Sequence, residues 1–518
     1  MDTKALRQKI LDLAIRGKLV PQNPDDEPAS VLLEKIRAEK QQMVKEGKLK
    51  AKDIKNDTII FKGEDNLHYE KLQDGTVKCI EDEIPFEVPE GWAWARLNAL
   101  SENITDGDHQ PPPQTKSGIP FLVITNVSEG SINFKNTRFV SQDYYDALSI
   151  YRKAQMGDLL FTVTGSYGIP IPVESNQPFC FQRHIAIIRP YIISNYYLNI
   201  VLASKYIKKL CDDLSTGTAQ KTVGLAFLRN FLIPVPSLSM QSAIVTKTNE
   251  LLASTLTIQK NRNEIIDTIK NTKYKILDLA IRGKLVPQDP NDEPASVLLE
   301  RIRAEREELI KQGKIKRDKK ESVIFKGDDN SYYDCIPETW AITSLSELTT
   351  SLNLNDGNWI LSENMAKTGE VKLIQLGSIG NMKYLNKGYK FLTNKTFEEL
   401  NCTQIFSGYM LINRIISDWM CACILPSIDG KLITTVDTCW IAPHDEYYNL
   451  KYLLYAISSP VFQSLVSMNT AGTTRKRISK KKLIVLPFPL PPLYEQGRIV
   501  KAIETAFSSL DSIRDTLL

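Results

Sequence analysis

Two short basic turns in the sequence have the side chains needed to bind phosphates and base edges of a nucleic acid. The first reads GTAQK (residues 217–221), and the second reads GTTRKR (472–477) and runs into RKRISKKK (475–482). Arginine can pair with guanine and glutamine with adenine, while lysine serves phosphates. The candidate contacts on these turns are Thr218, Gln220, Lys221, Thr473, Thr474, Arg475, Lys476, Arg477, Lys480 and Lys481.

Both turns also have a simpler structural interpretation. A Gly-Thr pair is often a helix cap, and a run of charged residues is usually a solvated face or turn. The same turn recurs in two otherwise dissimilar blocks, which favours a DNA-facing role. Within it, we expect Lys221, Lys476, Lys480 and Lys481 to hold phosphates without contributing to specificity.

Three other polar segments are candidates on weaker grounds. His109 and Gln110 lie in the loop DGDHQPPPQ (106–114), where His109 could equally be a surface histidine. The other two segments each supply a pair of candidates, one directly after an aromatic run and one at the end of YMLINR, near Asp418. For both pairs a structural role at a sheet edge is an equal alternative. These are Arg183 and His184, and Asn413 and Arg414.

No catalytic constellation holds together. The sequence has no GxxxxGK[ST] phosphate loop, no GxGxxG after a predicted strand, and no Asn- or Asp-Pro-Pro-aromatic motif of amino-methyltransferases. A nuclease-like set with Asp25 and Glu46 can be traced, but the second copy of that segment has Asn291 and Gln312 in place of the carboxylates. We therefore interpret the chain as non-catalytic.

Composition sets broad limits on the class of protein. A chain of 518 residues predicts two to four domains, and its net charge of +4 neither requires nor excludes a nucleic-acid partner. Eight cysteines without a CxxC pair and four scattered histidines argue against a zinc site. The N-terminal residues lack an apolar signal core, and no apolar run reaches membrane length. We expect a cytoplasmic protein with reduced thiols.

The chain repeats itself. Residues 10–39 and 276–305 differ at only three of thirty positions, with a constant offset of 266. An offset of 255 relates residues 216–221 to 471–476, and residues 233–245 to 488–500. The sequence is therefore two copies of one plan, in which a variable block is followed by a proline-rich exit, a helix and a helical hairpin.

A long helix in the middle of the chain is predicted by a heptad pattern. About 40 residues precede the stop at Gly283, or roughly 60 Å. Thr248, Thr255, Arg262 and Thr272 interrupt the apolar seam, which consists of Ile244, Leu251, Ile258, Ile265, Ile269, Ile276 and Leu279.

Half of the same pattern occurs at each end of the chain. Residues 499–517 repeat the first half of the central helix, and residues 6–17 repeat the second half. A half-helix with an exposed apolar stripe is unstable alone. We predict that the two ends join and pack antiparallel to the central helix, which makes the molecule pseudo-twofold and nearly circular. Tandem duplication without such closure is the alternative.

Each variable block has short runs rich in β-branched and aromatic residues, followed by one helical stretch (196–214 and 450–467). This predicts a small mixed α/β domain with a curved sheet. The fold class is thus mixed α/β, with two globular domains joined by two long antiparallel coiled-coil helices. The predicted segments are 1–60 (helical), 61–236 (first domain), 237–320 (central helical region), 321–491 (second domain) and 492–518 (C-terminal helix).

Almost the whole sequence resembles the DNA-specificity subunit of type I restriction–modification systems. The resemblance rests on the duplicated LDLAIRGKLVPQ…DEPASVLLE, on ITDGDHQPPPQTKSGIPFL and on GDLLFTVTGSYGIP with PFCFQRH. It also rests on LINRI, SDWMC, GTTRKRIS and FPLPPLYEQGRIV. Ser166 and Tyr167, on the GSYG turn of GDLLFTVTGSYGIP, complete the candidate DNA contacts. The first exit, PSLSMQSAIV, departs from the family pattern at Ser239 and Met240, which puts equal partner contact at both exits in doubt.

The resemblance implies a function and partners. In that family each of two target-recognition domains binds one half of a bipartite, asymmetric site in double-stranded DNA, and two antiparallel helices set the spacer. It implies two methyltransferase subunits and restriction (translocase-endonuclease) subunits as partners. No cofactor is expected in this chain, since S-adenosylmethionine, ATP and Mg²⁺ would act in the partners.

Two other hypotheses come from different classes. One is a coiled-coil adaptor whose globular blocks bind proteins; neighbouring methylase and helicase-nuclease genes would count against it. The other is an enzyme of the fused restriction–methylation type, which the missing motifs disfavour. The leading expectation is a non-catalytic, sequence-specific DNA-binding subunit without a membrane segment.

Overall fold

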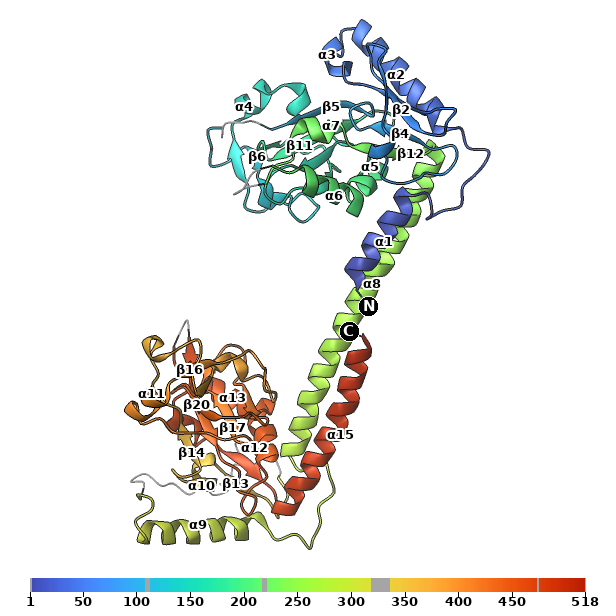
Figure 1. The fold of residues 1–518 in the computed structure, drawn as a ribbon. Helices are drawn as coiled ribbons and strands as arrows, with labels where there is room; N and C mark the ends of the chain where they lie inside the picture. Colours follow the sequence, from blue (N-terminus) through green and yellow to red (C-terminus); the bar gives the residue numbers. More distant parts are fainter. Residues whose placement is uncertain (1, 108–111, 217–220, 318–335, 473–474, 518) are drawn as a thin grey trace. The chain divides into compact units, whose positions relative to one another are not determined.

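The computed structural model describes residues 2–107, 112–216, 221–317, 336–472 and 475–517 (Figure 1). Contacts divide the chain into two compact units, unit 1 (Met1–Asn261) and unit 2 (Arg262–Leu518). The boundary falls inside one continuous helix of 44 residues, α8 (Leu238–Ile281). The mixed α/β fold class with two globular bodies and a long connecting helix is as predicted. No helix among the described residues is both long and apolar enough to cross a membrane.

Unit 1 is built on a four-stranded antiparallel sheet with the order β5-β11-β8-β9. A three-stranded sheet packs beside it, in the order β10-β6-β7, and β12 pairs with β4. A further sheet, β1-β2-β3, precedes these along the chain. The strands are β1 (Ile59–Lys62), β2 (His68–Lys71), β3 (Val77–Cys79), β4 (Ala93–Arg96), β5 (Ser101–Asp106), β6 (Ile119–Leu122), β7 (Arg138–Val140), β8 (Leu159–Thr162), β9 (Pro170–Pro172), β10 (Cys180–Phe181), β11 (Ile185–Pro190) and β12 (Leu232–Val235).

Unit 2 repeats the main sheet, the second sheet and the β4-β12 pair of unit 1, but its described residues contain no counterpart of the β1-β2-β3 sheet. Its main sheet has the order β14-β21-β17-β19, its second sheet β16-β15-β20, and β13 pairs with β23. A short pair, β18 with β22, is added. The strands are β13 (Ala341–Thr343), β14 (Leu354–Asp356), β15 (Val371–Ile374), β16 (Lys390–Leu392), β17 (Met410–Asn413), β18 (Ile415–Ile416), β19 (Ala422–Ile424), β20 (Lys431–Thr434), β21 (Thr438–Ile441), β22 (Lys476–Arg477) and β23 (Phe488–Leu490).

Helices enclose the sheets of both units. Those of unit 1, besides the first part of α8, are α1 (Thr3–Ile15), α2 (Ala29–Lys45), α3 (Ala51–Ile54), α4 (Gln142–Ala147), α5 (Asn195–Leu202), α6 (Lys205–Leu214) and α7 (Leu225–Arg229). Those of unit 2 are α9 (Ala295–Lys311), α10 (Leu345–Leu348), α11 (Asn394–Glu399), α12 (Leu450–Ile457), α13 (Pro460–Met468), α14 (Lys480–Leu483) and α15 (Leu493–Leu517). Short 3-10 turns occur at Glu81–Glu83, Ile124–Asn126, Ile150–Arg152, Ser362–Asn364 and Leu376–Ser378.

The repeated segment packs against the start of the block that follows it. Gly17 and Gly283 have φ of +65° and +66°, and a Cβ on either would lie 2.4 Å from a proline, Pro89 or Pro337. Only glycine tolerates both the backbone conformation and the close approach. Nearby, the indole nitrogens of Trp92 and Trp340 donate to Gln22 and Gln288, respectively. Each copy of the segment therefore packs closely against the start of the block that follows it. Two blocks need two copies, which explains why the chain carries the segment twice.

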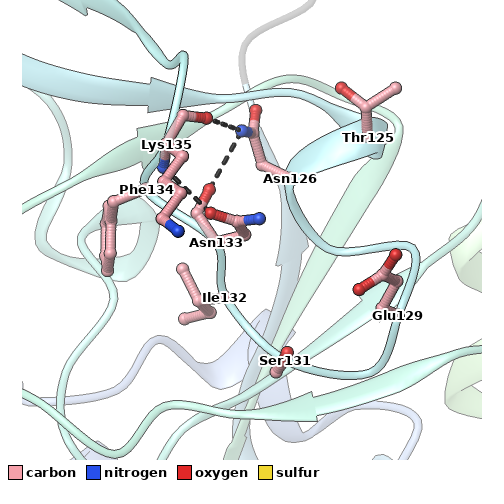
Figure 2. A pocket seen from close by; sticks show the side chains of 8 residues that line it. All are labelled: Thr125, Asn126, Glu129, Ser131, Ile132, Asn133, Phe134 and Lys135. Atoms are coloured by element: carbon pink, nitrogen blue, oxygen red, sulfur yellow. Dashed lines mark hydrogen bonds between the residues drawn. The ribbon is translucent and has the colours of Figure 1, made fainter. Parts of the chain in front are cut away.

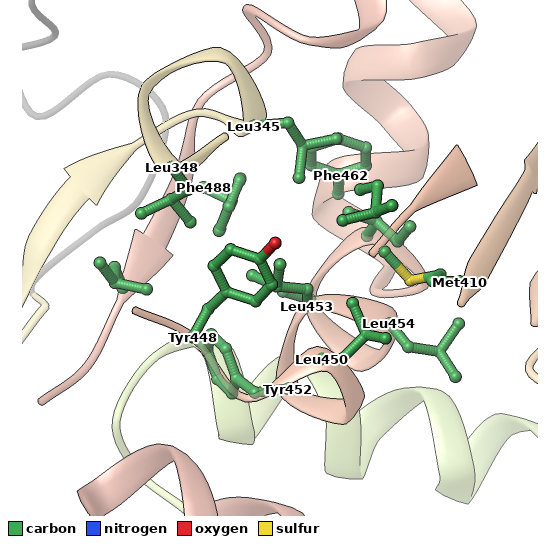
Figure 3. Packing of buried hydrophobic residues seen from close by; sticks show 14 of the residues in the cluster. Leu345, Leu348, Met410, Tyr448, Leu450, Tyr452, Leu453, Leu454, Phe462 and Phe488 are labelled. Atoms are coloured by element: carbon green, nitrogen blue, oxygen red, sulfur yellow. The ribbon is translucent and has the colours of Figure 1, made fainter. Parts of the chain in front are cut away.

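The two exits are also equivalent. The hydroxyls of Tyr197 and Tyr452 each donate to a proline carbonyl of the exit strand at 2.7 Å. Gln241 and Gln496, both fully buried, each accept from a backbone N–H before a helix and donate to a proline carbonyl. These contacts follow the 255-residue offset found in the sequence. In unit 2 the tyrosine is part of the apolar core shown in Figure 3, with Tyr448, Phe462 and Phe488.

The single helical stretch predicted in each block is in fact two helices. In unit 1 the break lies at Ser204, whose hydroxyl caps α6 by accepting from Ile207 N. In unit 2 it lies at Ser459, which caps α13, and Pro460 occupies the first turn. A capping serine and a first-turn proline start a new helix, although the apolar pattern continues through the break.

The seam of α8 is only partly as predicted. Ile244 and Ile269 are buried, but Ile258 and Ile265 are 44% and 40% exposed. Near the end of the helix Leu277, Ala280 and Ile281 are buried in the core of unit 2 instead. The end of α8 packs on a globular core as well as on a partner helix, so its buried face is wider than one heptad seam.

Each end of the chain packs along one part of α8. In unit 1, Ala14 and Ile15 of α1 share a core with Ile244 at the start of α8, and the two helices lie side by side in Figure 1. In unit 2, α15 runs antiparallel to the second part of α8, since Ile499 packs near Ile281 and Asp511 pairs with Lys273 at 2.7 Å.

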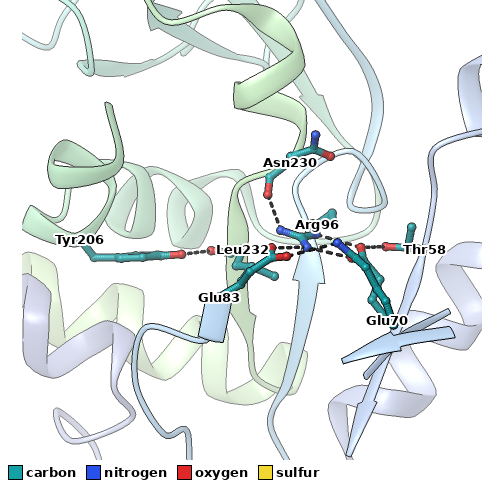
Figure 4. Close-up of polar contacts among 8 residues, drawn as sticks. Thr58, Glu70, Glu83, Arg96, Tyr206, Asn230 and Leu232 are labelled. Carbon is teal, nitrogen blue, oxygen red and sulfur yellow. Dashed lines mark hydrogen bonds and ion pairs between the residues drawn. The ribbon is translucent and has the colours of Figure 1, made fainter. Parts of the chain in front are cut away.

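A buried ion cluster fixes the β1-β2-β3 sheet to the rest of unit 1 (Figure 4). Arg96 on β4 donates from Nε and one Nη to the two oxygens of Glu70 on β2, both at 2.9 Å, and to Glu83 at 2.7 Å. Thr58 also donates to Glu70. These donors hold the pKa of Glu70 at about 2, against an ordinary 4.5, despite burial.

Candidate nucleic-acid interface

Four segments meet at one edge of the main sheet of unit 1, where β5 and β8 end and β11 and β9 begin. Gly107 N donates to Ile185 O at 3.3 Å, and a Cβ on Gly107 would lie 2.0 Å from Phe181 O. No other residue allows this approach. Gly107 therefore lies directly beside the turn with Arg183 and His184.

Backbone hydrogen bonds bring those unit 1 candidates that the structure describes to the same edge. Val163 N donates to His184 O at 2.9 Å, and Val223 N donates to Val163 O at 2.8 Å. Gly165 N donates to Lys221 O at 3.2 Å. Ser166, Arg183, His184 and Lys221 thus come from three separate segments but lie around Val163–Gly165. We call this region (residues 107, 163–168, 182–184 and 221–223) the loop edge of unit 1.

The side chains at this edge differ in how freely they face solvent. Arg183, Lys221 and Ser166 are exposed. Burial, together with the charge of Arg183, lowers the pKa of His184, so its ring is neutral at neutral pH. Tyr167 is packed against α6, where its hydroxyl donates to Asp212 at 2.8 Å and Lys208 Nζ lies 4.0 Å from its ring centre.

Unit 2 has the same backbone frame. Gly357 N donates to Thr438 O at 2.9 Å, and a Cβ on Gly357 would lie 2.3 Å from Thr434 O. Arg414 N donates to Asp437 O and Ile478 N donates to Arg414 O, as Val163 is bonded in unit 1. The loop edge of unit 2 therefore comprises residues 356–359, 413–416, 435–438 and 475–481, and Arg414 is the counterpart of Val163.

Arg414 does not face solvent, contrary to the expectation that it contacts a base. It is only 3% exposed, and its guanidinium donates to the carbonyls of Val436 and Ile478 and pairs with Asp356 at 3.3 Å. A guanidinium bound in this way holds the surrounding segments of the loop edge together. Its neighbour Asn413 is half-buried and its side-chain oxygen accepts from Ile415 N at 2.9 Å.

Two aspartates contact three further cations at the loop edge of unit 2. Asp437 pairs with Arg477 at 2.9 Å and with Arg475 at 3.6 Å, which places both guanidinium groups on one side of the edge. Lys480 Nζ donates to Asn355 Oδ1 at 2.7 Å and lies 4.0 Å from Asp356. Lys476 and Lys481 are exposed.

Asp356 also receives a contact from a buried thiol. Cys439 Sγ lies 3.1 Å from Asp356 Oδ1, and burial raises the pKa of this thiol well above its usual range, so that it stays protonated as a donor. The indole nitrogen of Trp440 donates to the carbonyl of the same aspartate. Asp356, Arg414, Cys439 and Trp440 thus form a polar network inside the loop edge of unit 2, whereas Arg475 is exposed and Arg477 is half-buried.

Six candidates fall outside the described residues, and two relevant residues were missed. The six are His109, Gln110, Thr218, Gln220, Thr473 and Thr474. The missed residues are Asp437, which orients two arginines, and Trp359, which is 68% exposed on the loop after β14. A third sequence offset, of 250, aligns DGDH (106–109) with DGNW (356–359) and could have identified Trp359.

A surface hollow and the distribution of possible metal ligands were the other places to look for a functional site. A surface hollow in unit 1 is lined by eight residues of one loop, 125–135, and is stabilised by Asn126, whose side chain bonds Asn133 O at 3.0 Å (Figure 2). Within the described part of the chain, no three His, Cys, Asp or Glu side chains are grouped as a metal site would require.

Comparisons with known proteins agree with this geometry. The family model described as "Type I restriction modification DNA specificity domain" matches residues 116–268 and 337–517. The chain is 29% identical to the type I restriction enzyme EcoAI specificity subunit of Escherichia coli, over 99% of this chain and 90% of that protein. It is 26% identical, with the same coverage, to the EcoEI specificity subunit of Escherichia coli.

A solved structure shares the fold. A chain from a study of the assembly and conformational transition of the type I restriction–modification system superposes with a TM-score of 0.54 and 17% identity. The match covers 84% of this chain and 94% of that one. On the family match, which spans both halves and more than half of the chain, this protein belongs to the type I restriction–modification DNA specificity family, whose members recognise DNA and are not catalytic.

Proposed function

We propose that each unit reads one half of a bipartite, asymmetric target in double-stranded DNA through its loop edge. The observation that carries this proposal is one backbone frame with two different sets of side chains. The same hydrogen bonds fix Val163 in unit 1 and Arg414 in unit 2, while the exposed residues around them are unrelated. A shared frame with unlike surfaces binds DNA in the same way but reads different bases.

Individual roles follow from exposure and pairing. In unit 1 we assign base contacts to Arg183, His184 and Ser166, and phosphate contact to Lys221. In unit 2 we assign base contacts to Arg475 and Arg477, which Asp437 holds side by side, since arginine can bind guanine with two hydrogen bonds. In unit 2 we assign phosphate contacts to Lys476 and Lys481. Arg414 and Lys480 position the edge from beneath.

The helices supply the spacing between half-sites. At about 1.5 Å per residue α8 is roughly 66 Å long, enough to separate two readers by about two helical turns of DNA. We further propose that α1 and α15 together mirror α8, which closes the chain into a pseudo-twofold arrangement. Support comes from their packing on the first and second parts of α8, respectively. The five-segment division 1–60, 61–236, 237–320, 321–491 and 492–518 goes with this proposal.

The catalytic work belongs to partners in this proposal. Two methyltransferase subunits using S-adenosylmethionine and restriction subunits using ATP and Mg²⁺ would assemble on this chain in the cytoplasm. The sequence relatives, which are named as specificity subunits of restriction enzymes, support such an assembly. The adaptor alternative has no comparable support.

Reciprocal substitutions test the assignment of the two edges. We expect Arg183→Ala to relax selectivity for bases of one half-site, and Arg475→Ala with Arg477→Ala to relax it for the other, each by about 10-fold or more. The measurement is binding of the full chain, with its methyltransferase subunit, to targets altered in one half-site at a time. Lys501→Ala, an exposed cation on α15, is the control. Equal loss at both half-sites for either variant would refute the modular assignment.

A further inference from the structure

Trp359 is the most exposed of the large aromatic side chains among the residues that the structure describes, apart from Tyr494. The residue is 68% exposed, although tryptophan is usually well covered in folded proteins. It follows β14 directly on the loop edge of unit 2. An exposed aromatic beside arginines is a typical feature of a recognition surface.

The backbone on both sides of Trp359 is fixed. Asn358 N donates to Thr434 O at 2.9 Å, and Val436 N donates to Asn358 O at 2.8 Å. The side chain of Asn358 accepts from Thr403 N at 2.8 Å. On the other side, Ile360 packs against a buried cluster that includes Val371 and Ile433. The indole is therefore presented to solvent from a rigid position, which lowers the entropic cost of binding.

The fixed loop also places Trp359 close to the cations of the edge. Its neighbour Asn358 bonds to Val436, and the next residue, Asp437, pairs with Arg475 and Arg477. Positive charge beside this apolar ring complements a DNA duplex, whose phosphates flank the exposed edges of its bases. The apolar group that bases present in the major groove is the C5-methyl of thymine.

We propose that Trp359 packs against a thymine methyl group in the half-site read by unit 2. Arginine at this edge would select guanine by hydrogen bonds, and the indole would select thymine by apolar contact. The inference rests on the proposed function but adds a specificity determinant that is neither charged nor part of a basic run. In unit 1 the sequence places His109 at the corresponding position.

Removing single thymine methyl groups from the DNA tests the contact. The full chain with its methyltransferase subunit is titrated against target duplexes in which each thymine of the half-site is replaced in turn by deoxyuridine, which lacks the methyl group. At one position we expect binding by the unaltered protein to weaken about fourfold, the value of one buried methyl. With Trp359→Ala, binding to the intact target should weaken about 10-fold, and that deoxyuridine should have no further effect. Trp359→Phe should retain part of the sensitivity.

A matched control and the contrary outcomes make the test decisive. Leu352→Ala removes another exposed apolar side chain, 57% exposed, at the opposite end of β14, and should leave binding unchanged. If Trp359→Ala binds the target as tightly as the unaltered protein, the inference is wrong. It is also wrong if this variant keeps the full deoxyuridine effect, or loses only its methyltransferase partner. If the unaltered protein shows no sequence preference, the proposed function itself fails.

Discussion

The loop edges of units 1 and 2 share the same backbone hydrogen bonds but carry different side chains. Residues 220–228 contain one basic residue, whereas the equivalent residues 475–483 contain six. Val163 at the centre of the first edge corresponds to the buried Arg414 of the second, and neutral His184 corresponds to Asp437. The difference shows that the scaffold tolerates complete replacement of its surface, because the hydrogen bonds that define the edge are made by the backbone.

The comparison predicts that the spacing and the two half-sites can be changed separately. Insertion of seven residues, two helical turns, next to Ile265 in α8 adds about 10 Å to the helix, or about three base pairs. We expect binding at the original spacing to fall about 100-fold and to recover on targets with a longer gap. Selection of bound sequences from a library of varied gaps measures this. If the half-site sequences changed along with the gap, the helices would not set the spacing independently of the domains that recognise the half-sites.

The buried cation makes unit 2 more dependent on its central residue than unit 1. Arg414→Met removes a guanidinium that serves Asp356 and two carbonyls, and should destabilise unit 2 by about 3 kcal/mol. Val163→Ala removes only two buried methyl groups, for about 1.5 kcal/mol. Hydrogen exchange of β17 and β8, respectively, reports the local loss. A smaller effect for Arg414→Met than for Val163→Ala would reverse the interpretation of this edge.

Acid should act on the small sheet of unit 1 before its main sheet. The pKa of Glu70 is depressed to about 2, so its pairing with Arg96 stabilises the folded state fully above the ordinary value of 4.5. This contribution is lost as the pH falls from about 4.5 towards 2. Exchange protection of β2 should fall in that window while β11 stays protected, and Glu70→Gln should lower it already at neutral pH. Simultaneous loss in both strands would show that the cluster is not local.

The smallest effect is expected from exposed lysines. Lys481→Ala should weaken binding only a few-fold, equally at all sequences, and reduce the slope of log affinity against log salt by about 0.9. Lys480→Ala was expected from sequence to do the same, but its ammonium is engaged by Asn355. It should therefore change the salt slope less than Lys481→Ala does. A sequence-dependent effect of Lys481→Ala would move this residue to the base contacts.

Much of the architecture could be predicted because it is repeated. The duplicated segment, the exits and the long helix are encoded locally by glycines, prolines and apolar periodicity, and the structure has all of them. The split of each block helix was missed, since Ser204 and Ser459 interrupt the chain without interrupting the apolar pattern. Exposure was the hardest property to predict, as Ile258 and Arg414 show in opposite directions.

The position of the candidate residues near a sheet edge could be predicted better than whether each side chain faces solvent. Arg183 and Lys221 come from distant segments that meet at the loop edge of unit 1, and a polar turn after a strand already suggests such a position. Which arginine is buried depends on neighbours from other strands. Arg414 becomes a structural residue because Asp356 and the carbonyls of Val436 and Ile478 surround it. No property of the segment YMLINR indicates that environment.

The proposed function requires that one chain carries two domains that recognise different DNA sequences. Mapping of methylated adenines in host DNA by single-molecule sequencing, with and without this gene, tests it directly. We predict one bipartite motif with two different half-sites and a fixed gap, which disappears without the gene. Replacement of residues 321–491 by those of a relative should change one half-site alone. A continuous or palindromic motif, or a methylation pattern that is unchanged without the gene, would contradict the account.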